Sequence, residues 1–194
     1  MHLLQSGSQM KTITMPLVCA ALLVCSPVRA QQTALQIDPA QTKVEFMVGS
    51  TLHTVHGTFT LKRSTLRFDP ATGNIEGEVA IDAASGETGN ESRDKRMHQE
   101  ILEAAKYPEI VFRPDRVEGK LASQGASQVK LHGTFVIHGA EHGITVPVDV
   151  QAVNGKYQAA AHFEVPYVQW GMKNPSTFIL RVDKIIAVTV RTQL

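Results

Sequence analysis

The chain has 194 residues, and its 19 Lys and Arg nearly balance its 18 Asp and Glu, which gives a net charge of +1. Because this balance leaves no basic stripe, no nucleic-acid partner is expected. Hydrophobic residues make up 43% of the sequence, enough to bury the core of one domain.

Residues 10–30, MKTITMPLVCAALLVCSPVRA, have the layout of a secretory signal peptide. A lysine near the start is followed by a short apolar run and by a small-residue cleavage site, VRA. We therefore expect residues 1–30 to be removed, with translation beginning at Met1 or Met10. Residues 31–194 then form a single domain that is periplasmic or secreted.

Both cysteines, Cys19 and Cys25, fall inside the segment expected to be removed. The remaining domain would therefore have neither disulfides nor cysteine-ligated metals. Nothing after residue 30 approaches the ~18 consecutive apolar residues of a membrane helix, so no stable membrane span is expected.

After residue 30, apolar residues recur at every second position between turn signals, which predicts antiparallel strands. The Asn154-Gly155 pair is typical of a type I′ hairpin turn between two of them. We expect strands at 42–48, 53–61, 64–69, 74–82, 109–112, 116–121, 128–137, 144–153, 156–165, 177–182 and 185–190.

All the phenylalanines fall in the apolar phase of these strands, so their rings should face one interior. Glycines at 57, 77 and 133 share that phase, where they mark either bends or room left for something else. About eight antiparallel strands with one helix fit a small closed all-β barrel, which is wide enough for a small ligand. A β-sandwich is the alternative, because periodicity does not reveal closure.

One stretch favours a helix, at roughly 90–106. Thr88 and Glu91 have the spacing of a capping box, and Pro108 prevents continuation. The helix is either a plug that fills the end of the barrel or a lid that faces a ligand. Its apolar face consists of Met97, Ile101, Leu102 and Ala105.

Two histidines three residues apart, His53 and His56, lie in the stretch HTVHGTFTL. Side chains three apart in a strand point to opposite faces, so the pair should not chelate one ion. His56 shares the outward phase, whereas His53 begins the strand on the inward side. There it either hydrogen-bonds to the backbone or places an imidazole at the mouth of a cavity.

Two further features each leave two interpretations open. Arg93-Asp94 at the helix start is either an acid/base or anion-binding pair, or a response to the helix dipole. The loop 166–176, with Tyr167 and Trp170, either rims a pocket or packs a strand crossing. No nucleophile elbow, phosphate loop or spaced carboxylate pair is present, so an enzyme is not expected.

The assembled pattern resembles the YceI-like family, exported bacterial proteins of lipocalin-like fold associated with polyisoprenoid binding. The resemblance covers nearly all of residues 35–192 and is most specific in ETGNESRDKRMHQEILEAAKYPEIVFRP (87–114). Supporting matches are VEFMV (44–48), VHGTF (55–59), FDP (68–70), AIDAAS (80–85) and LHGTFVIHGAEHGITVPVDV (131–150).

The chain departs from the family pattern at two places. Many members carry a histidine eight residues before the glycine of the valine-x-glycine motif, and here that position is Gly49. The paired phenylalanines of the helix are replaced by Ile101 and Leu102. Both changes touch the pocket side, so the ligand of this chain could differ from that of other members.

The resemblance implies a non-enzymatic protein that sequesters or carries a polyisoprenoid or similar long apolar ligand, with a role in envelope stress. An isoprenoid lipid or quinone is the candidate ligand; no other cofactor is expected, and a homodimer is a candidate assembly. The residues expected to contact the ligand are Phe46, Val48, Phe59, Phe68, Phe112, Phe135, Phe163 and Phe178 from the wall, Met97 and Ile101 from the helix, Trp170 and Met172 from the loop, and His53 at the head group.

Two alternative functions remain at this point. One is a metal-binding protein or enzyme that combines His53 with His138 or His142, although no metal ligand set is expected. The other is a filled barrel that acts through its surface as an interaction partner.

Overall fold

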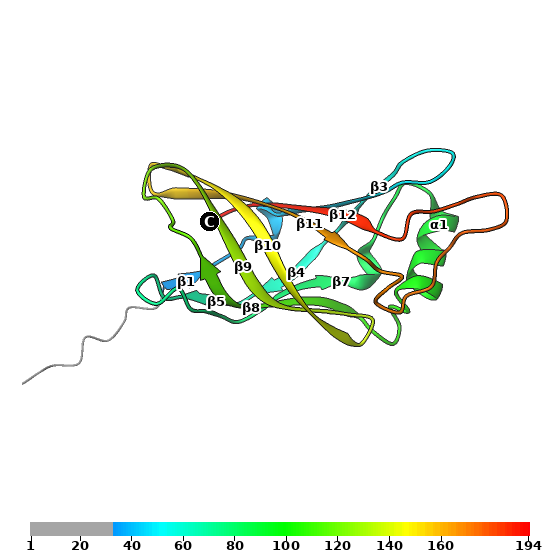
Figure 1. Ribbon diagram of the computed structural model, residues 1–194, viewed down its shortest axis with the longest axis horizontal. Helices are drawn as coiled ribbons and strands as arrows, with labels where there is room; N and C mark the ends of the chain where they lie inside the picture. Colours follow the sequence, from blue (N-terminus) through cyan, green and yellow to red (C-terminus); the bar gives the residue numbers. More distant parts are fainter. Residues whose placement is uncertain (1–32) are drawn as a thin grey trace, which may run out of the picture.

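The computed structural model describes residues 33–194, so the expected signal peptide lies outside the described residues. The chain forms antiparallel strands joined by turns and short helical segments (Figure 1). The strands are β1 (Thr33–Leu35), β2 (Lys43–Val48), β3 (Val55–Phe59), β4 (Leu61–Ser64), β5 (Leu66–Phe68), β6 (Ile75–Glu76), β7 (Val79–Asp82), β8 (Glu109–Glu118), β9 (Gly125–Ile137), β10 (Ala140–Val153), β11 (Lys156–Val165) and β12 (Ile186–Gln193). The helical segments are η1 (Pro39–Gln41), η2 (Ala83–Ser85), α1 (Glu91–Arg96) and the π-helical η3 (Met97–Ile101).

Nine strands form one antiparallel sheet in the order β3-β2-β12-β11-β10-β9-β8-β7-β4. The two edge strands, β3 and β4, follow one another in the chain through Thr60. Backbone hydrogen bonds then link β3 and Thr60 to β7 and the segment after it: Thr58 and Glu87 exchange N–H···O bonds of 2.9 and 3.0 Å, and the Asp82 N–H donates to the Thr60 carbonyl at 3.1 Å. The sheet therefore curls into a nearly closed barrel, and the β-sandwich alternative is wrong.

A second, three-stranded sheet in the order β1-β5-β6 lies at one end of the barrel. The barrel is elongated, with α1 at one end and β1, β5 and the C-terminus at the other (Figure 1). Residues 36–42 lead from β1 to the start of β2. The two ends of the barrel are therefore built differently, and this difference positions the candidate site.

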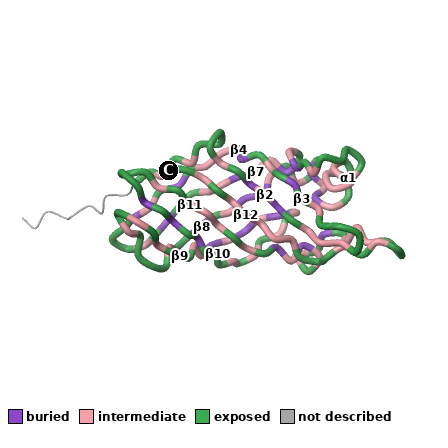
Figure 2. Tube along the Cα trace, turned by 90° about the horizontal axis from the view of Figure 1, so that it is seen from above, coloured by how far each residue is buried: buried purple, intermediate pink, exposed green. Residues whose placement is uncertain are grey.

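The predicted alternation is clear in β10 and its turn. Val146, Val148 and Val150 are buried, whereas the residues between them are exposed, because successive side chains of a strand point to opposite faces. Figure 2 shows buried residues along the barrel and exposed ones in the loops. Asn154 and Gly155 both have positive φ, 52° and 76°, which confirms the type I′ turn.

Several predicted strands differ from the observed ones, and the strand at 53–61 begins only at Val55 and breaks at Thr60 into β3 and β4. The predicted strand at 177–182 is a turn, with one bridge from Val182 to Ser50. The strand at 74–82 breaks at Gly77, whose φ is +109°. The strand at 64–69 breaks at Thr65, whose N–H donates to Glu78 at 2.9 Å. The two strands at 109–112 and 116–121 are the single strand β8, with a register shift after Pro114.

The helix begins close to the predicted start but is shorter than 90–106. Its N-cap is Asn90 rather than Thr88, because the Asn90 side chain accepts a hydrogen bond from the Arg93 N–H at 3.0 Å. The helix continues as a π-helical turn to Ile101 and ends there, followed by Glu103 with φ of 46°. Within residues 33–194, no helix has the length and apolar character needed to cross a bilayer.

Two of the inward-phase glycines allow close approach of neighbouring groups. A Cβ at Gly57 would meet the Phe46 ring and, at 2.7 Å, the Glu87 carbonyl oxygen. A Cβ at Gly133 would meet the Arg113 carbonyl oxygen and, at 2.7 Å, the Pro114 Cα. These glycines therefore serve the packing of the wall and leave no room for a ligand at their own positions.

The outer face of β4, β7 and β8 carries a network of ion pairs. The Arg63 guanidinium donates to Glu109 at 2.5 and 2.9 Å and to Glu78 at 2.7 Å. Lys62 adds a contact of 3.0 Å to Glu109. The hydrogen bonds from Arg63, and then those from Lys62, lower the pKa of Glu109 to about 2. The ionised carboxylate is therefore the form that the folded chain favours.

We expect Glu109→Gln to destabilise the fold at neutral pH and to lose this effect in acid. A carboxylate whose folded-state pKa lies below its unfolded value of 4.5 stabilises the fold above that value, and the contribution is lost as pH falls towards about 2. Urea unfolding of the wild type and the Glu109→Gln variant, from neutral pH down to about pH 2, measures the difference in their free energies of unfolding. Glu141→Gln is the control, because Glu141 is 68% exposed and has one contact of 3.3 Å to Arg113. A difference that does not change with pH would contradict the prediction.

We expect Gly133→Ala to lower the free energy of unfolding by about 1–3 kcal/mol, because the added methyl overlaps the backbone of β8. The matched control is Gly143→Ala on the neighbouring strand β10, where an added Cβ has no atom within 4 Å. Chemical denaturation of both variants compares them. Equal stability of the two would show that β8 moves aside without cost.

Candidate functional site

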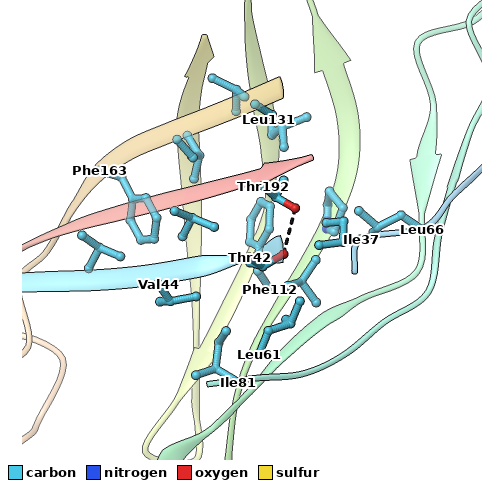
Figure 3. Close-up of a pocket in the computed structure, with 18 of the residues that line it drawn as sticks. Ile37, Thr42, Val44, Leu61, Leu66, Ile81, Phe112, Leu131, Phe163 and Thr192 are labelled. Carbon is cyan, nitrogen blue, oxygen red and sulfur yellow. Dashed lines mark hydrogen bonds between the residues drawn. The ribbon is translucent and has the colours of Figure 1, made fainter. Parts of the chain in front are cut away.

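The barrel encloses a cavity of about 280 Å³. Its wall consists of inward-facing side chains of the barrel strands, extended at one end by residues of β1, β5 and β6. In Figure 3, side chains from five different strands converge on this space: Val44, Leu61, Ile81, Phe112 and Phe163. The cavity follows from the period-two alternation, which directs one side of every strand inwards.

The barrel interior is hollow for part of its length. Phe112, Leu131 and Phe163 face the interior yet are only half-buried, because they border the cavity. Ring centroids lie close together at Phe135, which is 5.9 Å from Phe163 and 5.8 Å from Trp170, and at Phe46, which is 5.2 Å from Phe59. The aromatic side chains therefore fill one part of the barrel and leave the rest open, which argues against the filled-barrel alternative.

A cluster of buried side chains closes the end beside α1. Leu102 and Ala104 come from the segment after η3, and Tyr167 and Met172 come from the loop before β12. The Tyr167 hydroxyl donates a hydrogen bond to the Asp183 carbonyl at 2.8 Å. Burial, and then the charge of Asp183, raises the pKa of Tyr167, so the phenol stays protonated and keeps donating. The helical segment is thus packed as a plug.

The opposite end of the cavity reaches partly exposed residues, which we call the mouth. The lining there comprises Leu35 and Ile37 near the start of the described chain, Leu121 between β8 and β9, and Leu194 at the C-terminus. Leu121 is exposed, and the other three are half-buried. A ligand can therefore reach the cavity at the end that carries the β1-β5-β6 sheet.

The lining contains almost no polar groups. Among the described residues that line the cavity, none is charged, and the polar side chains are Thr42, Tyr157 and Thr192. The two threonine hydroxyls lie 2.8 Å apart (Figure 3), and Thr42 also donates to the Asp38 carbonyl at 2.7 Å. Because an unpaired charge is costly to bury, this interior suits an uncharged, apolar ligand.

Six of the predicted ligand contacts line the cavity, and four others belong to the plug. The helix and loop residues Met97, Ile101, Trp170 and Met172 pack in or against the closing cluster and are absent from the cavity lining. Val48 is half-buried near the end of β2 and does not line the cavity. The six lining residues are Phe46, Phe59, Phe68, Phe112, Phe135 and Phe163. For these residues, for the four plug residues and for Val48, contact with a ligand stays a prediction.

The positions of Phe178 and His53 were predicted wrongly. Phe178 is 96% exposed, because Thr177–Leu180 is a turn in which the Thr177 N–H donates to the Leu180 carbonyl at 2.8 Å. His53 lies in the exposed loop before β3 and does not start that strand; its carbonyl accepts from the Ser50 hydroxyl at 2.6 Å. Neither side chain faces the cavity.

The histidines considered for a metal site contact different partners. His138 Nε2 lies 2.7 Å from a Glu103 carboxylate oxygen, and the His142 ring stacks on Trp170 at 4.1 Å. Among residues 33–194, no group of three or more His, Cys, Asp or Glu side chains is placed to hold a metal ion. His56 is exposed, as its outward phase predicted.

The Arg93-Asp94 pair is used at the helix start. The Asp94 carboxylate accepts from the N–H of Thr88 at 3.0 Å and from its hydroxyl at 2.5 Å. Arg93 donates to the same hydroxyl at 2.7 Å and to the Thr88 carbonyl at 3.0 Å. Both side chains hold the segment that leads into α1, and this structural role accounts for the motif.

Sequence reasoning missed most of the aliphatic lining. The alternation of inward-facing and outward-facing residues in β10 and β11 identifies Val146, Val148 and Ala161 as lining candidates, but the prediction considered mainly phenylalanines. The mouth residues Leu35 and Ile37 carry no such signal, because they lie in or next to a strand of only three residues.

The chain is similar to known proteins in sequence pattern and in fold. Residues 35–194 match the family model of the YceI-like domain. No match was found among curated proteins. Three of the solved structures that share the fold are BcnA of Burkholderia cenocepacia, a polyisoprenoid binding domain from Saccharophagus degradans implicated in plant cell wall breakdown, and a YCEI protein of Campylobacter jejuni.

The three similarities are structural and extend over most of each chain. The BcnA structure has a TM-score of 0.66 at 17% identity, covering 81% of this chain and 99% of BcnA. The Saccharophagus domain has a TM-score of 0.63 at 16% identity, covering 84% and 96%. The Campylobacter protein has a TM-score of 0.55 at 19% identity, covering 95% and 98%.

Proposed function

The chain belongs to the family of YceI-like domain proteins, and from its apolar cavity we propose that it binds the hydrocarbon chain of an isoprenoid or similarly long lipid. The observation that carries the proposal is the lining, in which no side chain of the described residues is a carboxylate, ammonium, guanidinium or imidazole. The similar Saccharophagus domain, named as polyisoprenoid binding, supports the same ligand class.

Burial of apolar surface supplies the binding energy in this proposal. Each methylene removed from water contributes about 0.8 kcal/mol, so about ten of them give ~8 kcal/mol, or roughly micromolar affinity before ordering costs. The volume of about 280 Å³ lies just below the range of about 300–1,000 Å³ usual for ligand pockets. One segment of a long chain therefore fits, and the remainder with its head group extends past the mouth.

A binding role fits the chemistry of the cavity better than catalysis. The polar side chains of the lining are two threonines and a tyrosine, and the threonine hydroxyls already bond to each other. General acid–base work needs a group that exchanges protons near neutral pH within reach of the substrate. The proposed protein therefore holds and carries its ligand without transforming it.

The setting proposed for this activity is outside the cytoplasm. The support is the sequence of residues 10–30, with its lysine, apolar run and small-residue end. A carrier of apolar lipids in the envelope would shield hydrocarbon from water between membranes. The role in envelope stress suggested by the family resemblance belongs to the same proposal.

We expect Ala161→Phe to weaken ligand binding at least about tenfold, because a ring at this lining position occupies the cavity. The matched control is Ala160→Phe, one residue earlier in β11, because Ala160 borders a groove on the outside of the barrel with Gln128, Asp149 and Arg191 and does not line the cavity. Titration of the purified proteins with a hydrophobic fluorophore gives the affinities, and thermal unfolding checks that both variants fold. Equal binding by the two variants would place the ligand elsewhere.

The ligand itself is sought in the wild-type protein by solvent extraction and mass spectrometry. We expect a co-purified lipid with a long apolar chain, in lower amount in Ala161→Phe than in Ala160→Phe. If no lipid is extracted and the fluorophore shows no saturable binding, the proposed function is wrong.

A further inference from the structure

Two loops project at the plugged end of the barrel, near α1 (Figure 1), and backbone hydrogen bonds join them. One is residues 49–54 between β2 and β3, and the other is residues 173–185 before β12. The Thr51 N–H donates to the Arg181 carbonyl at 2.9 Å, and the Asp183 N–H donates to the Gly49 carbonyl at 2.9 Å. Their tips are therefore held by the barrel in a defined orientation.

The tips carry large apolar side chains in the open. Phe178 is 96% exposed, Ile179 is 83% exposed, and Leu52 on the other loop is 73% exposed. Phe178 and Ile179 are the two central residues of the Thr177–Leu180 turn, so they form its apex. Single exposed apolar residues are common, but three at the ends of two bonded loops mark an interaction surface.

Two cations lie on the same loop, Arg181 two residues from Ile179 and Lys184 nearer to β12. Arg181 and Lys184 are exposed, and neither forms an ion pair within the described part of the chain. Lys173 is paired with Glu100 at 2.6 Å. The Asp183 carboxylate is turned towards Gly49, at the base of the loops. With Arg181, Lys184 and the exposed Asp183, the segment 181–184 therefore carries a net charge of +1.

We propose that the two loops dock the protein on an anionic lipid surface, with Phe178, Ile179 and Leu52 inserted at the boundary between head groups and acyl chains. Arg181 and Lys184 then contact the anionic head groups. Apolar side chains flanked by Lys and Arg are the combination that binds peripheral proteins to such surfaces. This docking is separate from the cavity and does not depend on what the cavity holds.

A lipid surface fits these tips better than a second copy of the chain does. Specific protein interfaces use about 20–30 residues on each side, whereas the two loops expose four large apolar side chains, three at the tips and Ile185 next to β12. Insertion into a bilayer needs few side chains, because the surrounding lipid closes around each of them. The free cations match anionic lipid and would repel the same loops of a second copy.

The test is flotation of the purified protein with vesicles of phosphatidylcholine alone or mixed with phosphatidylglycerol. We expect binding to the mixed vesicles that weakens at about 0.5 M salt, where charges are screened within a few ångströms. Phe178→Ser with Ile179→Ser should lower the bound fraction about tenfold. Arg181→Gln with Lys184→Gln should remove most of the difference between the two vesicle types.

The control is Val153→Ser, which removes a 50% exposed apolar side chain next to the Asn154-Gly155 turn. It should leave flotation unchanged, and the Phe178/Ile179 variant should keep wild-type binding of a hydrophobic fluorophore, which separates docking from the cavity. Wild-type flotation by the Phe178/Ile179 variant would overturn the proposal. The proposal would also be overturned if the wild-type protein did not float but formed a concentration-dependent dimer in sedimentation, and the Phe178/Ile179 variant lost that dimer. The loop tips would then bind a second copy of the chain.

Discussion

The structure depends on closure of the sheet through Thr60. Because β3 and β4 are consecutive edge strands, the chain itself connects the two edges of the sheet at Thr60, and the Thr58–Glu87 and Asp82–Thr60 hydrogen bonds link this connection to β7 and the segment after it. An open sheet would expose its apolar face to water and its edges to other chains. Closure turns that face into the wall of an interior that contains no charged side chain among those described.

Closure of the sheet does not determine whether the interior is filled. The sizes of the inward-facing side chains determine it. Rings and the plug residues gather at the α1 end, where Phe135, Trp170 and Met172 pack together. The cavity wall also includes small residues such as Ala159 and Ala161, which occupy less of the interior than the rings do. The cavity is the space that the inward-facing side chains leave unfilled.

Local patterns predicted the architecture but not the ends of its elements. The burial of Val146, Val148 and Val150 and the Asn154-Gly155 turn depend on residues that are neighbours in the sequence. The local pattern was therefore sufficient to predict both features. Phe178 also fits an alternating phase, yet pairing of 177–182 is limited to the Ser50–Val182 bridge and its flanking bonds, and the segment turns at 177–180 instead. A strand depends on its partner, which lies far away in the sequence and leaves no mark in a local pattern.

The mouth and the projecting loops lie at opposite ends of the molecule. The fourteen residues of β10 extend between these ends, and at about 3.3 Å per residue a strand of this length gives a separation on the order of 40 Å. A barrel that stands on a bilayer by its loops would hold its aperture that far above the lipid, facing the aqueous compartment. Cargo would then be handed to a soluble acceptor or an opposing membrane, while the supporting bilayer would serve only as an anchorage.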